Sequence, residues 1–373
     1  MSQSKKLKEI AWLFFKLGSI SFGGPAAHIA MMEDEVVHKR KWMSREHFLD
    51  LIGATNIIPG PNSTEMTMHC GHERAGWKGL IVAGICFIAP AMFITGIFAW
   101  LYKEYGQLPA VTPFIYGIKP AVIAIILMAA YRLGQKAIKN TTLAILGLIT
   151  AILCVMGVNE IIALFGCGFM GVLIYLIGQR KSTFSSIAPL LLFQWSSALK
   201  IGSLKIFLTF LKIGAILYGS GYVLFAFLDA ELVAKGLLSS QELIDAIAVG
   251  QFTPGPILTT ATFIGWQMNG PLGAIAATVG IFLPSFLFVL ILNPLIPKMR
   301  DSKIMAAFLD AVNVAAVAVI VAVCISMGKE TLTDWRMIFI AVASMLTVFV
   351  FKKMNSGFIV LGGAVLGYFL SLI

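Results

Sequence analysis

Two Pro-Gly-Pro motifs, at 59–61 and 254–256, interrupt long apolar stretches of this chain. Hydroxyl and amide side chains flank both motifs, most densely at 62–64. Because proline lacks a backbone donor and blocks the preceding helical turn, each motif predicts a break in a helix. A helix that restarts after a break presents unpaired amide hydrogens and the positive end of its dipole, which suits an oxyanion. The motifs therefore indicate an anion site, and a pair of structural kinks is the alternative.

A glycine-rich break precedes each motif. The residues FGGP occupy 22–25, and YGSG occupies 218–221. Broken helices are tolerated at membrane depth only where protein or a water-filled cavity shields the exposed backbone. His28 follows the first of these breaks and could titrate near neutral pH or donate to an oxyanion. An ordinary hydrogen-bonded histidine is the alternative.

Three lysines lie within apolar segments. Lys16 and Lys212 occupy equivalent positions in two similar segments, and Lys119 directly precedes Pro120. A charge inside a membrane costs about 2.5 kcal/mol or more. The functional interpretation is a set of cations that attracts an anion. The alternative is that these long side chains reach the membrane surface.

Glu65 directly follows the polar run at 62–64. A carboxylate near an anion site is unfavourable unless it is protonated or paired. Glu65 could therefore be a proton-coupling group, or it could lie in water and pair with Arg74. The charged run at 33–40 is expected to be a solvated loop.

The expected site combines both kinds of break with the lysines. The residues expected to bind the substrate are Lys16, Gly23, Gly24, Pro25, His28, Asn56, Pro59, Gly60, Pro61, Asn62, Ser63, Thr64, Lys212, Gly219, Ser220, Gln251, Pro254, Gly255, Pro256 and Thr259. Glu65 and His28 are the candidates for proton coupling.

Enzymatic and metal-binding motifs are missing from the sequence. There is no Walker A, HExxH or GxSxG motif, so we expect no enzyme and no cofactor. His69 and His72 lie near Cys70, but no fourth ligand is evident, so we expect no metal site. The five cysteines are odd in number and mostly lie in apolar runs, which argues against a disulfide framework.

The composition of the chain requires a lipid bilayer around it. Of 373 residues, 58% are AVILMFWYC and only 12% are DEKR, about half the charged share of a soluble domain. The uncharged run at 80–100 is long enough to cross a bilayer as a helix. The sequence therefore predicts an all-α polytopic membrane protein. Its net charge of +10 comes without a basic cluster interleaved with aromatic residues, so we expect no nucleic-acid partner.

The sequence contains an internal repeat. Residues 15–24 read FKLGSISFGG, and residues 211–220 read LKIGAILYGS, at an offset of 196. The two Pro-Gly-Pro motifs align at an offset of 195, and Pro90 aligns with Pro284 at 194. The drift falls in polar loops, where insertions are tolerated. We conclude that the chain contains two homologous halves.

The halves define the expected domains. The first repeat covers 1–180, the second covers 203–373, and 181–202 is a linker that could supply one extra crossing at 187–199. Hydrophobic segments are expected near 9–28, 46–68, 76–102, 112–135, 141–157, 160–178, 203–228, 241–265, 271–296, 304–327, 334–351 and 355–373.

Basic residues predict the orientation of each half, because Lys and Arg accumulate in cytoplasmic loops. Those at 5–8, 39–45 and 74–78 lie on one side only if the first two segments are re-entrant hairpins, which makes the N-terminus cytoplasmic. The basic residues at 298–303 and 352–353 place the second half in the opposite orientation. Inverted repeats of this kind form a binding site near the bilayer midplane, between the halves.

With these residues assembled, the sequence resembles the chromate ion transporter family in its long, two-domain form. The motifs that carry the resemblance are FGGP at 22–25 with His28, PGPN at 59–62, and AGWKG at 75–79 leading to Pro90. Degenerate second copies lie at 218–221 and 254–256, so the resemblance covers nearly the whole chain. It implies an inner-membrane carrier that exports chromate, driven by the proton motive force, with halves of opposite orientation.

Two other functions remain open at this point. Amides, hydroxyls and lysines would bind sulfate as well as chromate, because sulfate and chromate are both tetrahedral dianions. Another small anion could bind to the same groups. A membrane enzyme, or an accessory protein without transport activity, is the less favoured alternative. The chain could also form a homodimer.

Overall fold

The computed structural model describes residues 2–22, 24–106, 108–178, 202–292, 302–351 and 354–372. Gly23 and the linker segment 187–199 lie outside the described residues. The described helices are α1 (Gln3–Ile20), α2 (Pro25–Glu33), α3 (Arg45–Thr55), α4 (Asn62–Tyr105), α5 (Thr112–Ala137), α6 (Thr141–Val155), α7 (Glu160–Gly178), α8 (Ser203–Ile216), α9 (Val223–Leu228), α10 (Ser240–Phe252), α11 (Thr260–Leu292), α13 (Lys303–Thr331), α14 (Trp335–Val350) and α15 (Ser356–Ser371). Short π-helical turns at Asp34–Lys39 and Asp229–Val233 follow α2 and α9, and a 3-10 turn at Ile257–Thr259 precedes α11.

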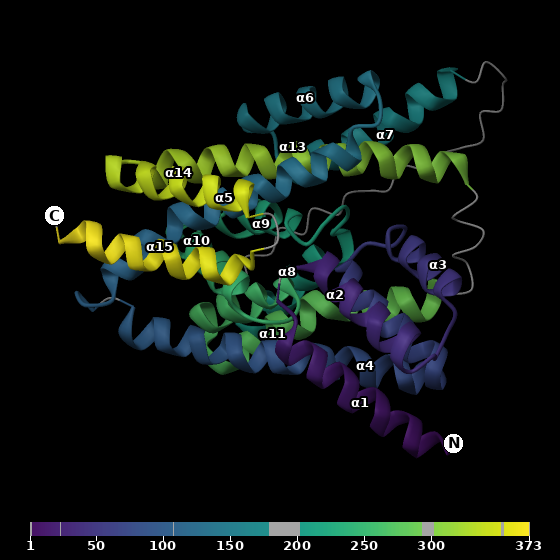
Figure 1. Ribbon diagram of the computed structural model, residues 1–373. Helices are drawn as coiled ribbons and strands as arrows, with labels where there is room; N and C mark the ends of the chain where they lie inside the picture. Colours follow the sequence, from purple (N-terminus) through teal and green to yellow (C-terminus); the bar gives the residue numbers. More distant parts are fainter. Residues whose placement is uncertain are drawn as a thin grey trace.

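The helices form two bundles (Figure 1). In the hairpin bundle, α4 packs against α1 and α11, and α11 packs against α8. In the outer bundle, α13 packs against α5, α6 and α7, while α14 and α15 pack against α5. The second repeat joins the two bundles, because α10 packs against α5 and α15, and α9 packs against α13.

Each repeat begins with two helical hairpins. In the first hairpin, α1 and α2 are joined by the glycine-rich break, and Trp42 beyond α2 donates to Glu9 at the start of α1, at 3.2 Å. In the second, α3 and the first part of α4 (62–74, the inner helix) are joined by Pro-Gly-Pro, and His47 lies 3.1 Å from Glu73. The chain therefore enters and returns to the same end twice, as the predicted hairpins require.

A sharp kink ends the inner helix of α4, and an equivalent kink lies in α11 of the second repeat. Gly76 has φ 66° and ψ −156°, and Gly270 has φ 59° and ψ −152°. This left-handed conformation is open to glycine and strained for other residues. The matching geometry at positions 194 residues apart shows that the structure is repeated as well as the sequence.

The two repeats run in opposite directions. Gly84 of α4 lies against Phe286 of α11, and Gln267 near the start of α11 donates to the carbonyl of Ala99 near the end of α4, at 2.9 Å. Helices α4 and α11 are therefore antiparallel. We call the end that holds Glu9, His47 and Arg74 the near end, and the end that holds Tyr102, Gln241 and Asp334 the far end. The N-terminus lies at the near end, on the right of Figure 1.

Close helix crossings repeat in the same way. A Cβ on Gly18 of α1 would collide with the carbonyl oxygen of Phe87 in α4, and a Cβ on Gly214 of α8 would collide with that of Ile281 in α11. Glycine at these two positions lets the broken helices lie directly on the long helices, which fixes the depth of each break.

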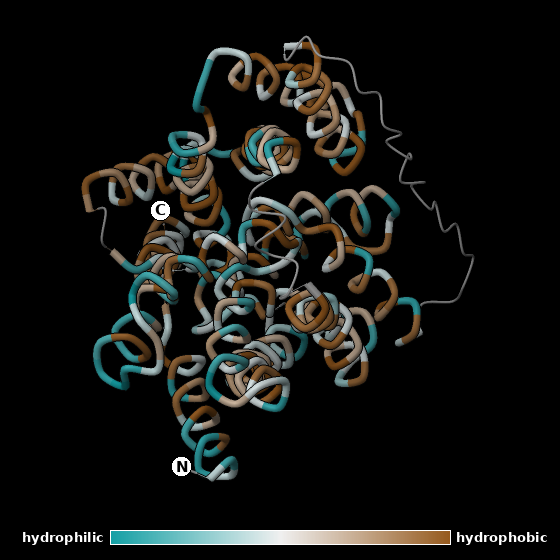
Figure 2. The backbone as a smooth tube through the Cα atoms, turned by 90° about the vertical axis from the view of Figure 1, so that its right-hand side faces the viewer, coloured by the Kyte–Doolittle hydropathy of each residue, from teal (hydrophilic) through white to brown (hydrophobic). Residues whose placement is uncertain are grey.

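Apolar side chains cover the outside of the molecule as well as its core. Exposed large residues include Leu148, Ile177, Leu346 and Phe358 on the outer bundle. Figure 2 looks from the near end and shows hydrophobic residues spread through both bundles. Such extensive exposed apolar surface is typical of lipid contact. Five described helical spans are long and apolar enough to cross a membrane, at Asn62–Tyr105, Thr112–Ala137, Glu160–Gly178, Ile257–Ile291 and Lys303–Thr331.

At the sharp kink within α4, the inner helix packs closely against the rest of α4 through Gly71 and Gly79, and this contact gives a first prediction. A Cβ on Gly71 would collide with the carbonyl oxygen of Gly79 and lie 2.6 Å from the Cβ of Ala83. We expect Gly71→Ala to lower stability by about 1–3 kcal/mol, as overpacking does. Thermal unfolding of the purified protein in detergent measures this. Gly96→Ala on the same helix is the control, because nothing lies within 4 Å of its Cβ; equal midpoints for the two variants would contradict the packing described here.

Candidate functional site

The breaks of the two repeats are bonded to each other. The amide of Gly60, in the first Pro-Gly-Pro, donates to the carbonyl of Leu217 at 2.7 Å. The amide of Gly255, in the second, donates to the carbonyl of Ser21 at 2.8 Å. Ser21 and Leu217 are equivalent positions at the ends of α1 and α8, 196 residues apart. Each Pro-Gly-Pro therefore meets the glycine-rich break of the other repeat, about a pseudo-twofold axis.

These bonds correct one expectation. The amide hydrogens of Gly60 and Gly255 are not unpaired, because the opposite repeat accepts both. The amides of Thr64 and Glu65 donate to the carbonyl of Pro61. Helix geometry therefore leaves the amides of Asn62 and Ser63 without an intrahelical acceptor, at the positive end of the inner helix.

Gly60 occupies the tightest point of the first break. Its φ of 142° disfavours other residues, and a Cβ there would collide with the carboxyl oxygen of Glu65 and lie 2.5 Å from the hydroxyl oxygen of Ser285. At the second break, a Cβ on Gly255 (φ 87°) would lie 2.7 Å from the Cβ of Ala91. Ala91 and Ser285 are equivalent residues, so the first break carries a hydroxyl where the second carries a methyl group.

Polar side chains gather at the first break. The buried ring of His28 on α2 places its Nδ1 3.3 Å from the hydroxyl of Ser63. The side-chain amide nitrogen of Asn62 (Nδ2) donates to the side-chain oxygen of Asn56 (Oδ1) at 2.6 Å. Asn56 is exposed and Asn62 is half-buried. The start of the inner helix is therefore accessible from outside the molecule.

Glu65 is the most deeply buried charged residue of this group, with 0% of its surface exposed. Its neighbours are the hydroxyl of Ser285, the phenol of Tyr218 and the backbone of Gly60. Among the described residues, none donates a well-aligned hydrogen bond to either carboxyl oxygen. The alternative in which Glu65 lies in water and pairs with Arg74 is wrong, because Arg74 donates to Glu9 at 2.9 Å.

The second break starts its helix with apolar residues. The positions that correspond to Asn62 and Ser63 at an offset of 195 are Ile257 and Leu258. The hydroxyl of Thr259 donates to the carbonyl of Pro256 at 2.9 Å. Of the remaining expected residues there, Gln251 and Pro254 are buried, Gly219 is exposed and Ser220 is half-buried. The duplicated scaffold thus carries polar chemistry mainly in its first copy.

Lys16 and Lys212 are ion-paired in equivalent ways. The ammonium of Lys16 lies 3.5 Å from the carboxylate of Glu35, and that of Lys212 lies 2.6 Å from Glu231. Both carboxylates are buried within the π-helical turns, where Lys39 and Lys235 also contact them. Each lysine therefore joins the two arms of its own hairpin.

This arrangement also corrects the expected solvated loop at 33–40. The segment continues α2 into a π-helical turn, and Glu35 is only 7% exposed because Lys16, Lys39 and Arg40 surround it. The hairpin reversal brings Lys16 to this carboxylate, and a linear reading of the sequence does not show that contact.

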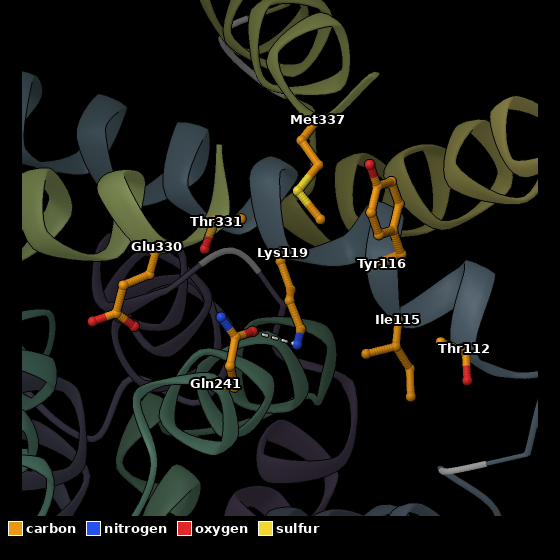
Figure 3. Close-up of a pocket in the computed structure, with 8 residues that line it drawn as sticks. All are labelled: Thr112, Ile115, Tyr116, Lys119, Gln241, Glu330, Thr331 and Met337. Carbon is orange, nitrogen blue, oxygen red and sulfur yellow. Dashed lines mark hydrogen bonds between the residues drawn. The ribbon is translucent and has the colours of Figure 1, made fainter. Parts of the chain in front are cut away.

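The far end is closed by a polar cluster. Lys119 on α5 donates to Gln241 at 2.6 Å and lies 3.5 Å from Asp245, both on α10. Tyr102 of α4 donates to the same Asp245 at 2.6 Å. A cavity of about 130 Å³ lies in front of this cluster, and its lining residues are Thr112, Ile115, Tyr116, Lys119, Gln241, Glu330, Thr331 and Met337 (Figure 3).

The near end is arranged differently from the far end. Asp50 on α3 is equivalent to Asp245, yet Asp50 is exposed whereas Asp245 is only 5% exposed. Apolar contacts between α3 and α13 involve Ala54 and Ile57 against the first turns of α13. The first break is therefore open toward the near end, and the second is sealed from the far end.

Sequence reasoning missed two residues of the site. Ser285 and Tyr218 face Glu65, but they come from the second repeat, so no local motif links them to it. Ser285 directly follows Pro284, which aligns with Pro90, and a residue-by-residue comparison of the repeats would have shown the Ala91 to Ser285 difference.

The sequence profile described as chromate transporter matches residues 8–172 and again residues 204–368. The chain belongs to the chromate transporter family. A probable chromate transport protein of Synechococcus elongatus is 28% identical over 97% of this chain and 95% of its own length. A chromate transport protein of Cupriavidus metallidurans is 28% identical over 97% and 92%.

One similar protein has no assigned substrate in its name. An uncharacterized transporter of Methanocaldococcus jannaschii is 29% identical over 95% of this chain and 92% of its own length. No solved structure matches the chain significantly. The two profile matches coincide with the two structural repeats, so membership in the family covers both halves.

Proposed function

We propose that this protein is a secondary transporter that exports chromate across the inner membrane, with its binding site at the first break. The observation that carries the proposal is the accessible start of the inner helix, where the amides of Asn62 and Ser63 and the side chains of Asn56 and His28 converge. A helix N-terminus with hydroxyl and amide donors suits a tetrahedral dianion. The full-length similarity to chromate transport proteins supports chromate as that anion.

The near end is proposed to face the cytoplasm. Basic residues concentrate there, at 5–8, 40–45 and 136–139, and the positive-inside rule places such residues inside. The N-terminus is then cytoplasmic, and both hairpins of the first repeat are re-entrant. Because the first break opens toward this end, the structure corresponds to a state that loads chromate from the cytoplasm.

Release of chromate requires the near end to close and the far end to open. In inverted repeats, alternating access arises when one set of elements moves against the other around a fixed site. Helix α10 is bonded to α5 because Lys119 of α5 contacts Gln241 and Asp245 of α10. We propose that α10 leaves α5 as α3 advances along α13, which opens the far end and closes the near end.

Glu65 is proposed to couple this cycle to the proton motive force. An unpaired carboxylate at this depth is costly, whereas its protonated form is not. The carrier with an empty anion site therefore changes state with Glu65 protonated, and Glu65 releases its proton at the near end before chromate loads. The proton enters as the anion leaves, so the two fluxes are coupled in opposite directions.

Flux measurements test the transport function. Purified protein in liposomes should take up radiolabelled chromate, and export coupled to proton entry predicts accumulation against a gradient when the lumen is acidic. Glu65→Gln should abolish this accumulation but retain chromate–chromate exchange, because glutamine keeps the size and removes the proton. Sulfate competition separates the alternative substrate: stronger inhibition by sulfate than by chromate itself would assign the carrier to sulfate. Absence of any anion movement would refute the proposal.

A further inference from the structure

We propose that Glu65, His69 and the His47–Glu73 pair form a proton pathway from the near end to the first break. The pathway lies entirely in the first repeat. This inference rests on the proposed proton coupling, and it assigns residues that the coupling itself does not require.

The pathway follows one face of the inner helix. His69 is four residues beyond Glu65, and Glu73 is four residues beyond His69. Residues spaced by four lie above one another on a helix, with Cβ atoms about 5–6 Å apart. Water molecules can bridge polar groups that do not touch directly, so we propose that water completes each step of the pathway. The three groups therefore connect the break to the kink at the near end.

His69 has no structural partner that would explain its burial. It is 1% exposed, and neither ring nitrogen forms a hydrogen bond with a described residue. Buried polar side chains are nearly always hydrogen-bonded, so an unsatisfied imidazole needs an explanation. A neutral imidazole accepts a proton at one nitrogen and releases one from the other, which is the property that a relay needs. Intramembrane histidine and glutamate side chains in series are typical of proton relays.

The outer end of the pathway reaches solvent. His47 on α3 lies 3.1 Å from Glu73, and their side chains are 45% and 36% exposed. The pair can therefore exchange protons with water at the near end.

The inner end of the pathway lies among neutral groups. Glu65 faces the hydroxyl of Ser285 on α11 and the phenol of Tyr218 beyond α8. On the α2 side, His28 is directed at Ser63. No cation among the described residues lies against Glu65. No salt bridge therefore stabilises the ionised carboxylate against its protonated form.

The second repeat lacks every member of this series. At offsets of 194 or 195, Glu65 corresponds to Thr259 or Thr260, and His69 corresponds to Phe263 or Ile264. Glu73 corresponds to Gln267 or Met268. The same backbone thus forms in the second repeat without titratable side chains at these three positions, although His47 corresponds to Glu242 at an offset of 195, so the three inner-helix groups are not needed for the fold. A pathway in one copy only would exchange protons with one end of the molecule, the near end, where a proton that has entered is released.

The test combines a spectroscopic and a transport measurement on the full chain. Infrared difference spectra between wild type and Glu65→Gln identify the Glu65 carboxyl band, and its rate of hydrogen–deuterium exchange reports proton access without any anion. His69→Gln should slow this exchange by about a hundredfold or more, as loss of a general acid–base group does. It should also slow pH-driven chromate accumulation while chromate–chromate exchange continues at the wild-type rate.

Two controls isolate the relay from packing. Cys70→Ala changes the next residue, which is buried against Met66 on another face of the same helix, and His38→Gln removes an exposed histidine. Both should exchange at the wild-type rate. An unchanged rate in His69→Gln, or the absence of a protonated Glu65 band, would overturn the pathway. Normal infrared behaviour without chromate flux would instead refute the transport proposal and leave the pathway standing.

Discussion

Gly60→Ala should abolish chromate transport while the protein still inserts into the membrane. Gly60 has a φ of 142°, and its amide donates to Leu217 of the other repeat at 2.7 Å. An added Cβ would collide with the Glu65 carboxyl group and lie 2.5 Å from the Ser285 hydroxyl oxygen. The substitution therefore displaces the break, the proposed coupling residue and the contact between repeats together. Radiolabelled chromate uptake in proteoliposomes measures the loss.

A matched glycine separates this effect from simple backbone strain. Gly157 also has a positive φ, of 93°, but nothing lies within 4 Å of its Cβ, because it is in the connection after α6. Gly157→Ala should lose some stability but keep its transport rate. Gly255→Ala should be as damaging as Gly60→Ala if both contacts between the repeats are needed. Normal uptake by Gly60→Ala would show that the first break is not the transport site.

Cross-linking α5 to α10 should stop transport completely and reversibly. The side-chain ends of Lys119 and Gln241 touch in this structure, so cysteines at both positions, in a background free of other cysteines, are separated by no more than the length of the two replaced side chains. If α10 must leave α5 to open the far end, a short bifunctional thiol reagent that can be cleaved by reduction will trap the loaded state. Uptake should fall to background after cross-linking and return after reduction.

The single variants are the controls for that experiment. Lys119→Cys alone and Gln241→Cys alone, treated with the same reagent, should keep their activity. Chromate binding by the cross-linked protein should also persist, because the first break still opens toward the near end. Unimpaired transport by the fully cross-linked double variant would refute the proposed movement of α10.

Local sequence features predicted the breaks and their duplication. Proline and glycine restrict or free the backbone wherever they occur, so Pro-Gly-Pro at 59–61 and 254–256 marks a break without knowledge of the tertiary structure. Equivalent kinks at Gly76 and Gly270, and equivalent crossings at Gly18 and Gly214, confirm the offsets that the sequence contains. Charge distribution likewise predicted repeats that run in opposite directions, as α4 and α11 do.

Partnerships between distant residues could not be predicted. The amide of Gly60 is paired because the packing of α8 brings Leu217 to it, from 157 positions away in the chain. Lys16 looks like an isolated intramembrane charge until the hairpin reversal places Glu35 beside it. In both cases the residue type was correctly noticed, but its partner depends on tertiary contacts that no local pattern encodes.

The difference between the repeats is also present in the sequence. The shared glycines and prolines show the duplication, whereas Glu65 and His69 have no titratable counterparts in the second half. The counterparts, Thr259 or Thr260 and Phe263 or Ile264, cannot titrate. Where a duplicated scaffold keeps its glycines and prolines in both copies but its polar groups in one, the polar copy is the stronger candidate for function.

The most direct test of the binding site is to locate chromate in the protein. Chromium scatters X-rays anomalously, so crystals of the protein soaked with chromate would give a peak at the bound anion. The account predicts one peak next to the amides of Asn62 and Ser63, on the side that faces the break at 217–222. A peak at the second break beside Ile257, or only in the far-end cavity beside Lys119, would contradict it.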